Sequence, residues 1–158
     1  HEDVMKWLVR IQQTMPYGVK ATEAPHYRRG FLQESRRLGA VAAGAGAKRK
    51  DLLGRAPKGV NDGDGFVFIS HIGDVYPSGF LPVVCGNVRE RSLADIYRNS
   101  PVMKQLRDKS LLKGKCGVCE FKAICGGSRA RAYAVTGDYL ASDPYCAYTP
   151  KGWHPGDQ

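Results

Sequence analysis

Features that would place this chain in a membrane or a secretory pathway are missing from its sequence. No stretch approaches the run of about eighteen apolar residues that a membrane-spanning helix needs, and nothing at the start resembles a signal peptide. A chain of 158 residues, 42% of them hydrophobic, can build a core without disulfide bonds. We therefore expect a cytoplasmic protein with no membrane partner, in a compartment that keeps cysteines reduced.

Acidic residues are also scarce: 15 Asp and Glu stand against 24 Lys and Arg, a formal charge of +9. Such an excess can attract nucleic acid, anionic lipid or an acidic substrate. The basic residues are spread through four short clusters, Arg28-Arg29, Arg36-Arg37, Lys48-Arg49-Lys50 and Arg129 with Arg131. Neither interleaved aromatic residues nor a recognised binding motif accompanies them. A solvated surface is therefore favoured, and nucleic acid is not expected as a partner.

Histidine pairs at metal-binding spacing are missing too, and only one pair of cysteines is separated by two residues. That pair is Cys116 and Cys119, followed by Cys125 and, after twenty intervening residues, by Cys146. Thiolates bind zinc or iron-sulfur clusters, and zinc sites usually add a second close pair or two histidines. The unequal gaps here favour a 4Fe-4S cluster, whose corners are reached from different directions. A zinc site remains the alternative, and a disulfide scaffold would leave one of five cysteines unpaired.

The residues around these cysteines resemble the SPASM-type auxiliary-cluster region of radical S-adenosylmethionine (radical SAM) enzymes, especially those of haem maturation. The resemblance covers about residues 66–149 and includes Cys-x2-Cys-x5-Cys with a fourth cysteine about twenty residues on. Three further segments carry it, Gly73-Asp74-Val75-Tyr76-Pro77, Gly86-Asn87-Val88-Arg89-Glu90 and residues 125–134. It implies that one 4Fe-4S cluster is bound by Cys116, Cys119, Cys125 and Cys146. That cluster would transfer electrons or position substrate while a peptide or a cofactor precursor, such as a tetrapyrrole, is modified.

The sequence departs from that family at the residues for a second auxiliary cluster. Ser78 stands where the leading ligand normally follows Val-Tyr-Pro, and Ser128 with Arg129 occupy the place of another common cysteine. Cys85 alone cannot hold a cluster, and a small buried free cysteine is the more common situation. We therefore expect one auxiliary cluster rather than two.

The motif Cys-x3-Cys-x2-Cys, with which such enzymes cleave S-adenosylmethionine, does not occur. The chain also begins at His1 inside a helical pattern, so we expect a fragment whose first part is absent. By resemblance, the absent barrel domain would bind S-adenosylmethionine and a second 4Fe-4S cluster and be reduced by ferredoxin or flavodoxin. The parent protein would then be an enzyme, and this piece alone should not generate radicals.

The expected fold class is α+β, in four consecutive parts. Residues 1–38 would be the remnant of the barrel end, residues 39–65 a Gly/Ala-rich linker, residues 66–149 the SPASM-like lobe and residues 150–158 a tail. In the first part, a helix ends before Pro16, a strand covers residues 17–22 and a second helix runs from Pro25 to about Leu38. The first helix has an apolar face of Val4, Trp7, Leu8 and Ile11.

Within the lobe, residues 66–70 and 74–77 predict a β-hairpin with its turn near Gly73, which we expect to cover the cluster. Ser92 is a predicted N-cap of a helix over residues 93–99, and Pro101 begins another. A last helix should run from Ser128 to about Val135. The buried face of the middle helices is predicted to contain Leu93, Ile96, Tyr97, Val102, Met103 and Leu106.

Four residues are secondary candidates for substrate contact or for tuning the cluster. Ser128 begins a helix whose first N–H groups, with those of Gly126 and Gly127, would face the electron-rich cluster. Arg129 and Arg131 would offset cluster charge or bind a substrate carboxylate, unless they form ordinary surface ion pairs. His26 would serve as a ligand or a proton carrier, or else pack as an ordinary polar residue. Glu23 and Tyr27 share that location.

Overall fold

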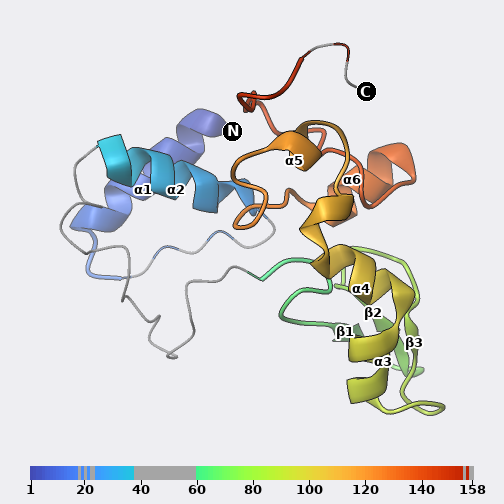
Figure 1. Cartoon of the computed structure of the whole chain (residues 1–158). Helices are drawn as coiled ribbons and strands as arrows, with labels where there is room; N and C mark the ends of the chain where they lie inside the picture. Colours follow the sequence, from blue (N-terminus) through green and yellow to red (C-terminus); the bar gives the residue numbers. More distant parts are fainter. Residues whose placement is uncertain (18, 20, 22–23, 38–59, 155, 157–158) are drawn as a thin grey trace.

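The computed structural model describes residues 1–17, 19, 21, 24–37, 60–154 and 156, and within them the chain has an α+β fold (Figure 1). Six α-helices, one short 3-10 helix and a three-stranded antiparallel sheet are formed by these residues. Most of the predicted linker, residues 39–59, lies outside the described residues, as does Glu23. None of the described helices is long and apolar enough to cross a membrane.

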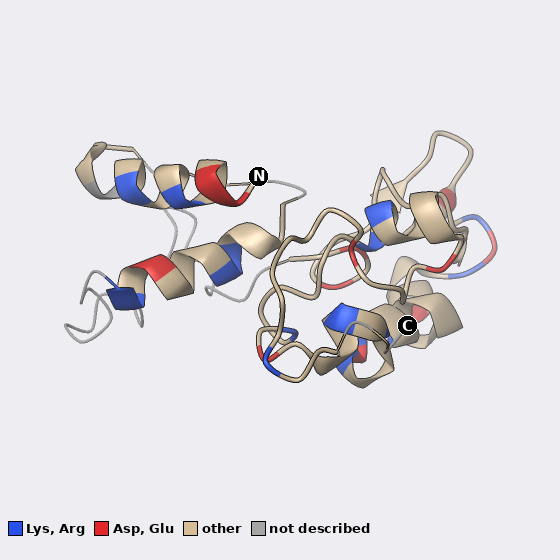
Figure 2. Ribbon diagram, turned by 90° about the horizontal axis from the view of Figure 1, so that it is seen from above, with Lys and Arg blue, Asp and Glu red and all other residues tan. Residues whose placement is uncertain are grey.

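The first two helices, α1 (Glu2–Thr14) and α2 (His26–Arg37), pack against each other, side by side in Figures 1 and 2. Gly30 of α2 faces Met5 of α1, and a Cβ at Gly30 would lie at ordinary van der Waals distance, 3.7 Å, from the Met5 Cβ. Arg10 donates to the buried carboxylate of Glu34 at 2.8 Å, so an ion pair also joins the two helices.

The predicted apolar face of α1 is only partly covered by the described residues, with Leu8 and Ile11 half-buried. Val4 and Trp7 are 53% and 56% exposed, whereas Val9 is fully buried. Spacing identifies residues that share a face, but the position of α2 decides which face is covered. The predicted strand over residues 17–22 is not formed at Tyr17, Val19 or Ala21, and residues 18, 20 and 22 lie outside the described ones.

The predicted hairpin is present as β1 (Phe68–Ile69) and β2 (Asp74–Tyr76). Its turn closes through the Gly73 N–H, which donates to the Ser70 carbonyl at 2.9 Å with Gly73 at φ +94°. A third strand, β3 (Gly86–Asn87), pairs antiparallel with β2 and was not predicted. Glycine and asparagine are poor strand formers, so only pairing with β2 reveals it.

Two short helices follow the sheet as predicted, α3 (Leu93–Asn99) and α4 (Pro101–Arg107). The Ser92 hydroxyl accepts from the Asp95 N–H at 3.2 Å and so caps α3. Leu93 is 39% exposed, so its predicted burial is wrong. The core consists of two groups of fully or largely buried residues, Val75, Cys85, Ile96 and Met103 in one and Leu81, Leu106 and Ala130 in the other.

Beyond this core the chain forms the 3-10 helix η1 (Lys109–Leu111), then α5 (Gly114–Val118) and α6 (Arg129–Thr136). Figure 1 shows α5 and α6 above α4 and the sheet, with the α1–α2 pair to the left of α5. Figure 2 shows Lys and Arg distributed over the whole chain rather than gathered on one element. The segment between α5 and α6 contacts α2, because Arg28 donates to the Ile124 carbonyl at 3.2 Å.

Candidate metal centre

The structure brings all four predicted cysteine ligands to one cavity. Its lining combines a helix from the start of the chain with loops near its end: His26, Arg29, Lys115, Cys116, Cys119, Lys122, Cys125, Gly126, Gly127, Asp143, Cys146, Tyr148 and Pro150. We expected the hairpin to cover the cluster, but no residue of the three described strands lines this cavity. Among the described residues, no three His, Cys, Asp or Glu side chains converge closely enough to hold one metal ion. The four thiols thus share a cavity without meeting at a point.

Glycines let the backbone come close to this cavity. Gly117, between the first two cysteines, has no room for a side chain, because a Cβ would lie 2.2 Å from the Leu112 carbonyl oxygen. Gly127 has φ +64°, and a Cβ there would lie 3.0 Å from the Cys116 sulfur and 2.9 Å from the Asp143 Cβ. The turn after Cys125 can therefore form only with a residue that lacks a side chain.

Backbone N–H groups stabilise negative charge on the sulfur atoms of this cavity. Cys119 accepts a hydrogen bond from the N–H two residues later, that of Phe121, at 3.4 Å. The N–H groups of Gly127 and Tyr148 act in the same direction, because they lower the pKa of Cys125 and of Cys146 against the effect of burial. Cys116 differs, because its sulfur accepts from the distant Asp143 N–H at 3.4 Å. Amide donors of this kind stabilise negative charge on sulfur and tune the potential of iron-sulfur clusters.

Burial nevertheless favours the neutral thiols when no cation is nearby. Burial raises the pKa of Cys125 to about 12, and the charges of Cys146 and Cys116 add to the increase. Burial likewise raises the pKa of Cys119 and of Cys146. Thiolates at these positions therefore need a positively charged group in the cavity, which is what a metal or an iron-sulfur core supplies.

Cys85 lies apart from this cavity, in the core beside Val75 and Ile96. Burial raises the pKa of its thiol, so it behaves as a small apolar residue, in line with the prediction. Ser78 is also buried, and its hydroxyl oxygen accepts from the N–H groups of Phe80 and Leu81 at 3.1 and 3.2 Å. At the position where the related family has a cysteine, this chain has a turn-forming serine.

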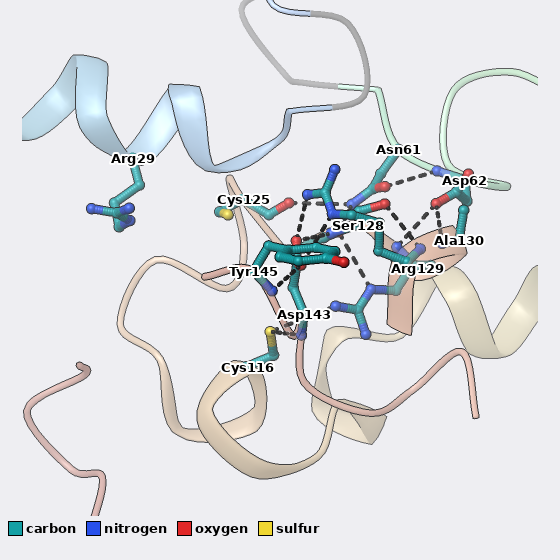
Figure 3. Close-up of polar contacts among 12 residues, drawn as sticks. Arg29, Asn61, Asp62, Cys116, Cys125, Ser128, Arg129, Ala130, Asp143 and Tyr145 are labelled. Carbon is teal, nitrogen blue, oxygen red and sulfur yellow. Dashed lines mark hydrogen bonds and ion pairs between the residues drawn. The ribbon is translucent and has the colours of Figure 1, made fainter. Parts of the chain in front are cut away.

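Asp143 connects the cysteine loops to α6 (Figure 3). Its carboxylate accepts from the Ser128 N–H at 2.8 Å. It also accepts from the Arg131 guanidinium at 3.2 and 2.7 Å. Burial acts to raise the pKa of Asp143, but Arg131 and the Ser128 N–H outweigh it and hold the pKa below its usual range. The guanidinium of Arg131 is thus engaged with Asp143, which is the ion-pair alternative that the sequence left open.

Arg129 is 1% exposed, so the alternative of an ordinary surface arginine is wrong for it. Its guanidinium donates to the carbonyls of Tyr139 and Ala141 at 3.0 and 2.7 Å and to the Cys116 sulfur at 3.5 Å. Arg129 therefore holds the backbone of the loop before Cys146 and contacts one thiol directly. Because the Arg129 side chain is enclosed, its guanidinium is not accessible to a substrate carboxylate in this conformation.

The first N–H groups of α6 are already paired, which corrects the expectation that they face the cavity. The Asp62 carboxylate accepts from the backbone N–H groups of Arg129 and Ala130 at 3.1 and 3.2 Å. The Ser128 hydroxyl accepts from the backbone N–H of Arg131 at 3.3 Å. Asn61, the residue before Asp62, donates to the carbonyls of Cys125 and Gly127 at 3.2 and 2.8 Å. Residues 61–62 fall in the predicted linker, but they lie buried against the cysteine loop, so the linker prediction is wrong for them.

The structure also adds residues that sequence reasoning missed. Arg29, on α2, lies in the cavity wall and stacks over the Tyr148 ring at 4.5 Å. Lys115 and Lys122, which donate to the carbonyls of Cys146 and Gly117, bring further positive charge to the lining. In the sequence, Arg29 is recognisable only as part of a basic cluster and Lys115 only as the residue before Cys116, so neither pattern predicts a place in the cavity wall. Tyr27 donates to Gln12 instead and does not line the cavity.

Part of the chain matches a known domain family. Residues 62–120 match the family model of SPASM, an iron-sulfur cluster-binding domain. The chain contains a SPASM-type region of the kind found in radical SAM proteins. The matched part of this SPASM-type region includes Cys116 and Cys119, whereas His26, Cys125 and Cys146 lie outside it.

Curated relatives extend the likeness over almost the whole chain. The AdoMet-dependent heme synthase of Methanosarcina barkeri is 44% identical over 154 residues, which cover 95% of this chain and 42% of the relative. The protein of that name from Nitratidesulfovibrio vulgaris is 39% identical over 159 residues, which cover 98% of this chain and 41% of the relative. A PqqA peptide cyclase of Xanthomonas euvesicatoria is 37% identical over 107 residues, which cover 63% of this chain and 29% of the relative. The chain thus spans about two fifths of the heme synthases, and its SPASM-type region is shared with the peptide cyclase.

Proposed function

We propose that this chain is the cluster-binding part of a radical SAM enzyme and that it binds one 4Fe-4S cluster through Cys116, Cys119, Cys125 and Cys146. The observation that carries the proposal is the common cavity of the four thiols, in which the sulfur atoms of Cys116 and Cys119 accept backbone N–H groups. When bound, such a cluster supplies one-electron chemistry. Four cysteines leave no iron corner open, which favours electron transfer over direct binding of substrate to iron.

The charges around the cavity support this assignment. A 4Fe-4S core with four thiolates carries a net negative charge, and Arg29, Lys115 and Lys122 lie in the lining. Asp143, the acidic residue of the lining, has its carboxylate engaged by Arg131. Its N–H, and not its carboxylate, is directed to the Cys116 sulfur. The lining is therefore electrostatically suited to an anionic cluster.

The whole enzyme would act on a tetrapyrrole or a peptide. Relatives named AdoMet-dependent heme synthase and PqqA peptide cyclase support these two classes of substrate, and the higher identity to the first favours a tetrapyrrole. The α1–α2 pair would belong to the end of the barrel that binds S-adenosylmethionine and a further cluster. The exposed Val4 and Trp7 are suitable for contact with the rest of that barrel. We place this activity in the cytoplasm, with ferredoxin or flavodoxin as reductant.

The test is a metal analysis of the chain after anaerobic purification or reconstitution with ferrous iron and sulfide. We expect about four irons and four sulfides per chain, a brown colour and an electron paramagnetic resonance signal after reduction with dithionite. One zinc per colourless chain, with no cluster after reconstitution, would contradict the proposal and make the site a structural zinc module. Failure to bind either metal would contradict both assignments.

A further inference from the structure

The histidine that begins α2, His26, is enclosed without a hydrogen-bond partner. It is 3% exposed, and among the described residues neither of its ring nitrogens has a partner. Buried polar groups are nearly always hydrogen-bonded, and leaving one unpaired is destabilising. The cavity that His26 lines is the one that contains the four cysteines. An unpaired polar ring in that wall therefore indicates a partner inside the cavity.

The chemistry of the cavity limits what that partner is. A neutral imidazole always carries one N–H donor, and thiolate and sulfide are acceptors. The four charged groups that act on His26 form two pairs, Arg29 with Glu2 and Arg131 with Asp143. An anionic sulfur cluster would place acceptors in the space that the ring faces. It would satisfy the donor that the protein leaves without a partner.

The position of His26 is fixed by the residue two places later in the chain. Arg28 donates to the Ile124 carbonyl at 3.2 Å and also to the Val60 carbonyl. Ile124 is adjacent to Cys125, so this contact attaches the first turn of α2 to the cysteine loop. Figure 3 shows Arg29 extending from the same helix, three residues after His26. The start of α2 thus forms a wall of the site although it is 90 residues before Cys116 in the sequence.

We propose that His26 donates a hydrogen bond from its ring N–H to a sulfur of the cluster and thereby raises the reduction potential of that cluster. This inference rests on the proposed function, since it requires the cluster. It adds a positioning residue outside the matched SPASM segment, contributed by the α1–α2 pair. A hydrogen bond to sulfur stabilises the more negative, reduced cluster more than the oxidised one, so its loss lowers the potential.

The experiment compares four reconstituted chains: wild type, His26→Phe, His26→Gln and His71→Phe. Phenylalanine keeps a ring but removes the donor, whereas glutamine keeps a donor. His71 is exposed in the hairpin turn and provides the matched control. We expect iron and sulfide contents near four in all of them. At a fixed solution potential, the ratio of reduced to oxidised cluster should fall about tenfold in His26→Phe. This corresponds to a decrease of about 59 mV in the reduction potential of a one-electron couple. It should fall less in His26→Gln and stay unchanged in His71→Phe.

A second measurement does not depend on the phenylalanine variant folding. With ¹⁵N-labelled histidine, pulsed electron paramagnetic resonance of the reduced wild-type cluster should show a weak nitrogen coupling that is absent in His26→Gln and present in His71→Phe. A coupling as strong as that of an iron-bound nitrogen would overturn the proposal, as would no histidine coupling. An unchanged potential in a loaded His26→Phe chain would overturn it while leaving the cluster assignment intact. A wild-type chain that binds no cluster would overturn both.

Discussion

Asp62 accepts hydrogen bonds from the backbone N–H of Arg129, 67 residues later, at 3.1 Å and from that of Ala130 at 3.2 Å. A side chain from before the sheet thus caps the helix that follows the third cysteine. Ser128, the N-cap residue itself, satisfies only the Arg131 N–H. The geometry of the cysteine loop therefore depends on a residue that is distant in sequence and carries no ligand atom for the cluster.

Replacing Asp62 with alanine should destabilise the chain by about 2 kcal/mol, because two buried N–H groups lose their acceptor. Urea unfolding of the loaded chain measures the loss, and hydrogen exchange should become faster at the amides of Arg129 and Ala130. Asp108 is the matched control, since it caps η1 at an exposed position. Asp108→Ala should cost no more than about 1 kcal/mol. Equal losses in the two variants would contradict the role given to Asp62.

Serine in place of any one of Cys116, Cys119, Cys125 and Cys146 should remove most of the iron, because one iron of the proposed cluster would lose its thiolate ligand. Cys119→Ser should also loosen residues 110–149. Cys85→Ser is the control, because Cys85 lies in the core apart from the cavity. Iron and sulfide analysis after reconstitution decides the matter. Full iron content in Cys119→Ser, or loss of iron only in Cys85→Ser, would count against the ligand set.

Arg129→Lys should destabilise the chain by about 3 kcal/mol, although it keeps the charge. A lysine ammonium cannot reproduce the fork that binds the Tyr139 and Ala141 carbonyls, so buried acceptors lose their donors. Arg91→Lys changes an exposed ion pair with Asp95 and should cost less than about 0.5 kcal/mol. Chemical unfolding of both variants tests this difference. A loss at Arg129 as small as that at Arg91 would show that the fork geometry is not required.

Gly127→Ala and Gly137→Ala separate backbone strain from collision. Both glycines have positive φ, +64° and +75°, but a Cβ at Gly137 meets open space. Gly137→Ala should therefore cost about 1 kcal/mol, from strain alone. Gly127→Ala should cost at least about 2 kcal/mol more, because its Cβ would collide with Asp143 and the Cys116 sulfur. We expect it to bind less iron as well. Similar stability and iron content in the two variants would exclude a steric role for Gly127.

Local signals in the sequence predicted much of the fold. Ser92 and Pro101 identified the starts of two helices correctly, and Gly73 identified the hairpin turn. Such features depend on neighbours a few residues away, which the sequence shows directly. β3 could not be found in this way, because its two residues have little strand preference and form a strand only beside β2.

The cysteine set and its family resemblance can be read from the sequence alone, because thiol chemistry and spacing are properties of the residues themselves. The surroundings of the cysteines depend instead on how the chain packs. His26 and Arg29 enter the cavity from α2, Asp62 caps α6, and Arg129 is buried instead of exposed. These relations join segments that are far apart along the chain. They arise when packing brings buried donors and acceptors together, and no local pattern encodes that pairing.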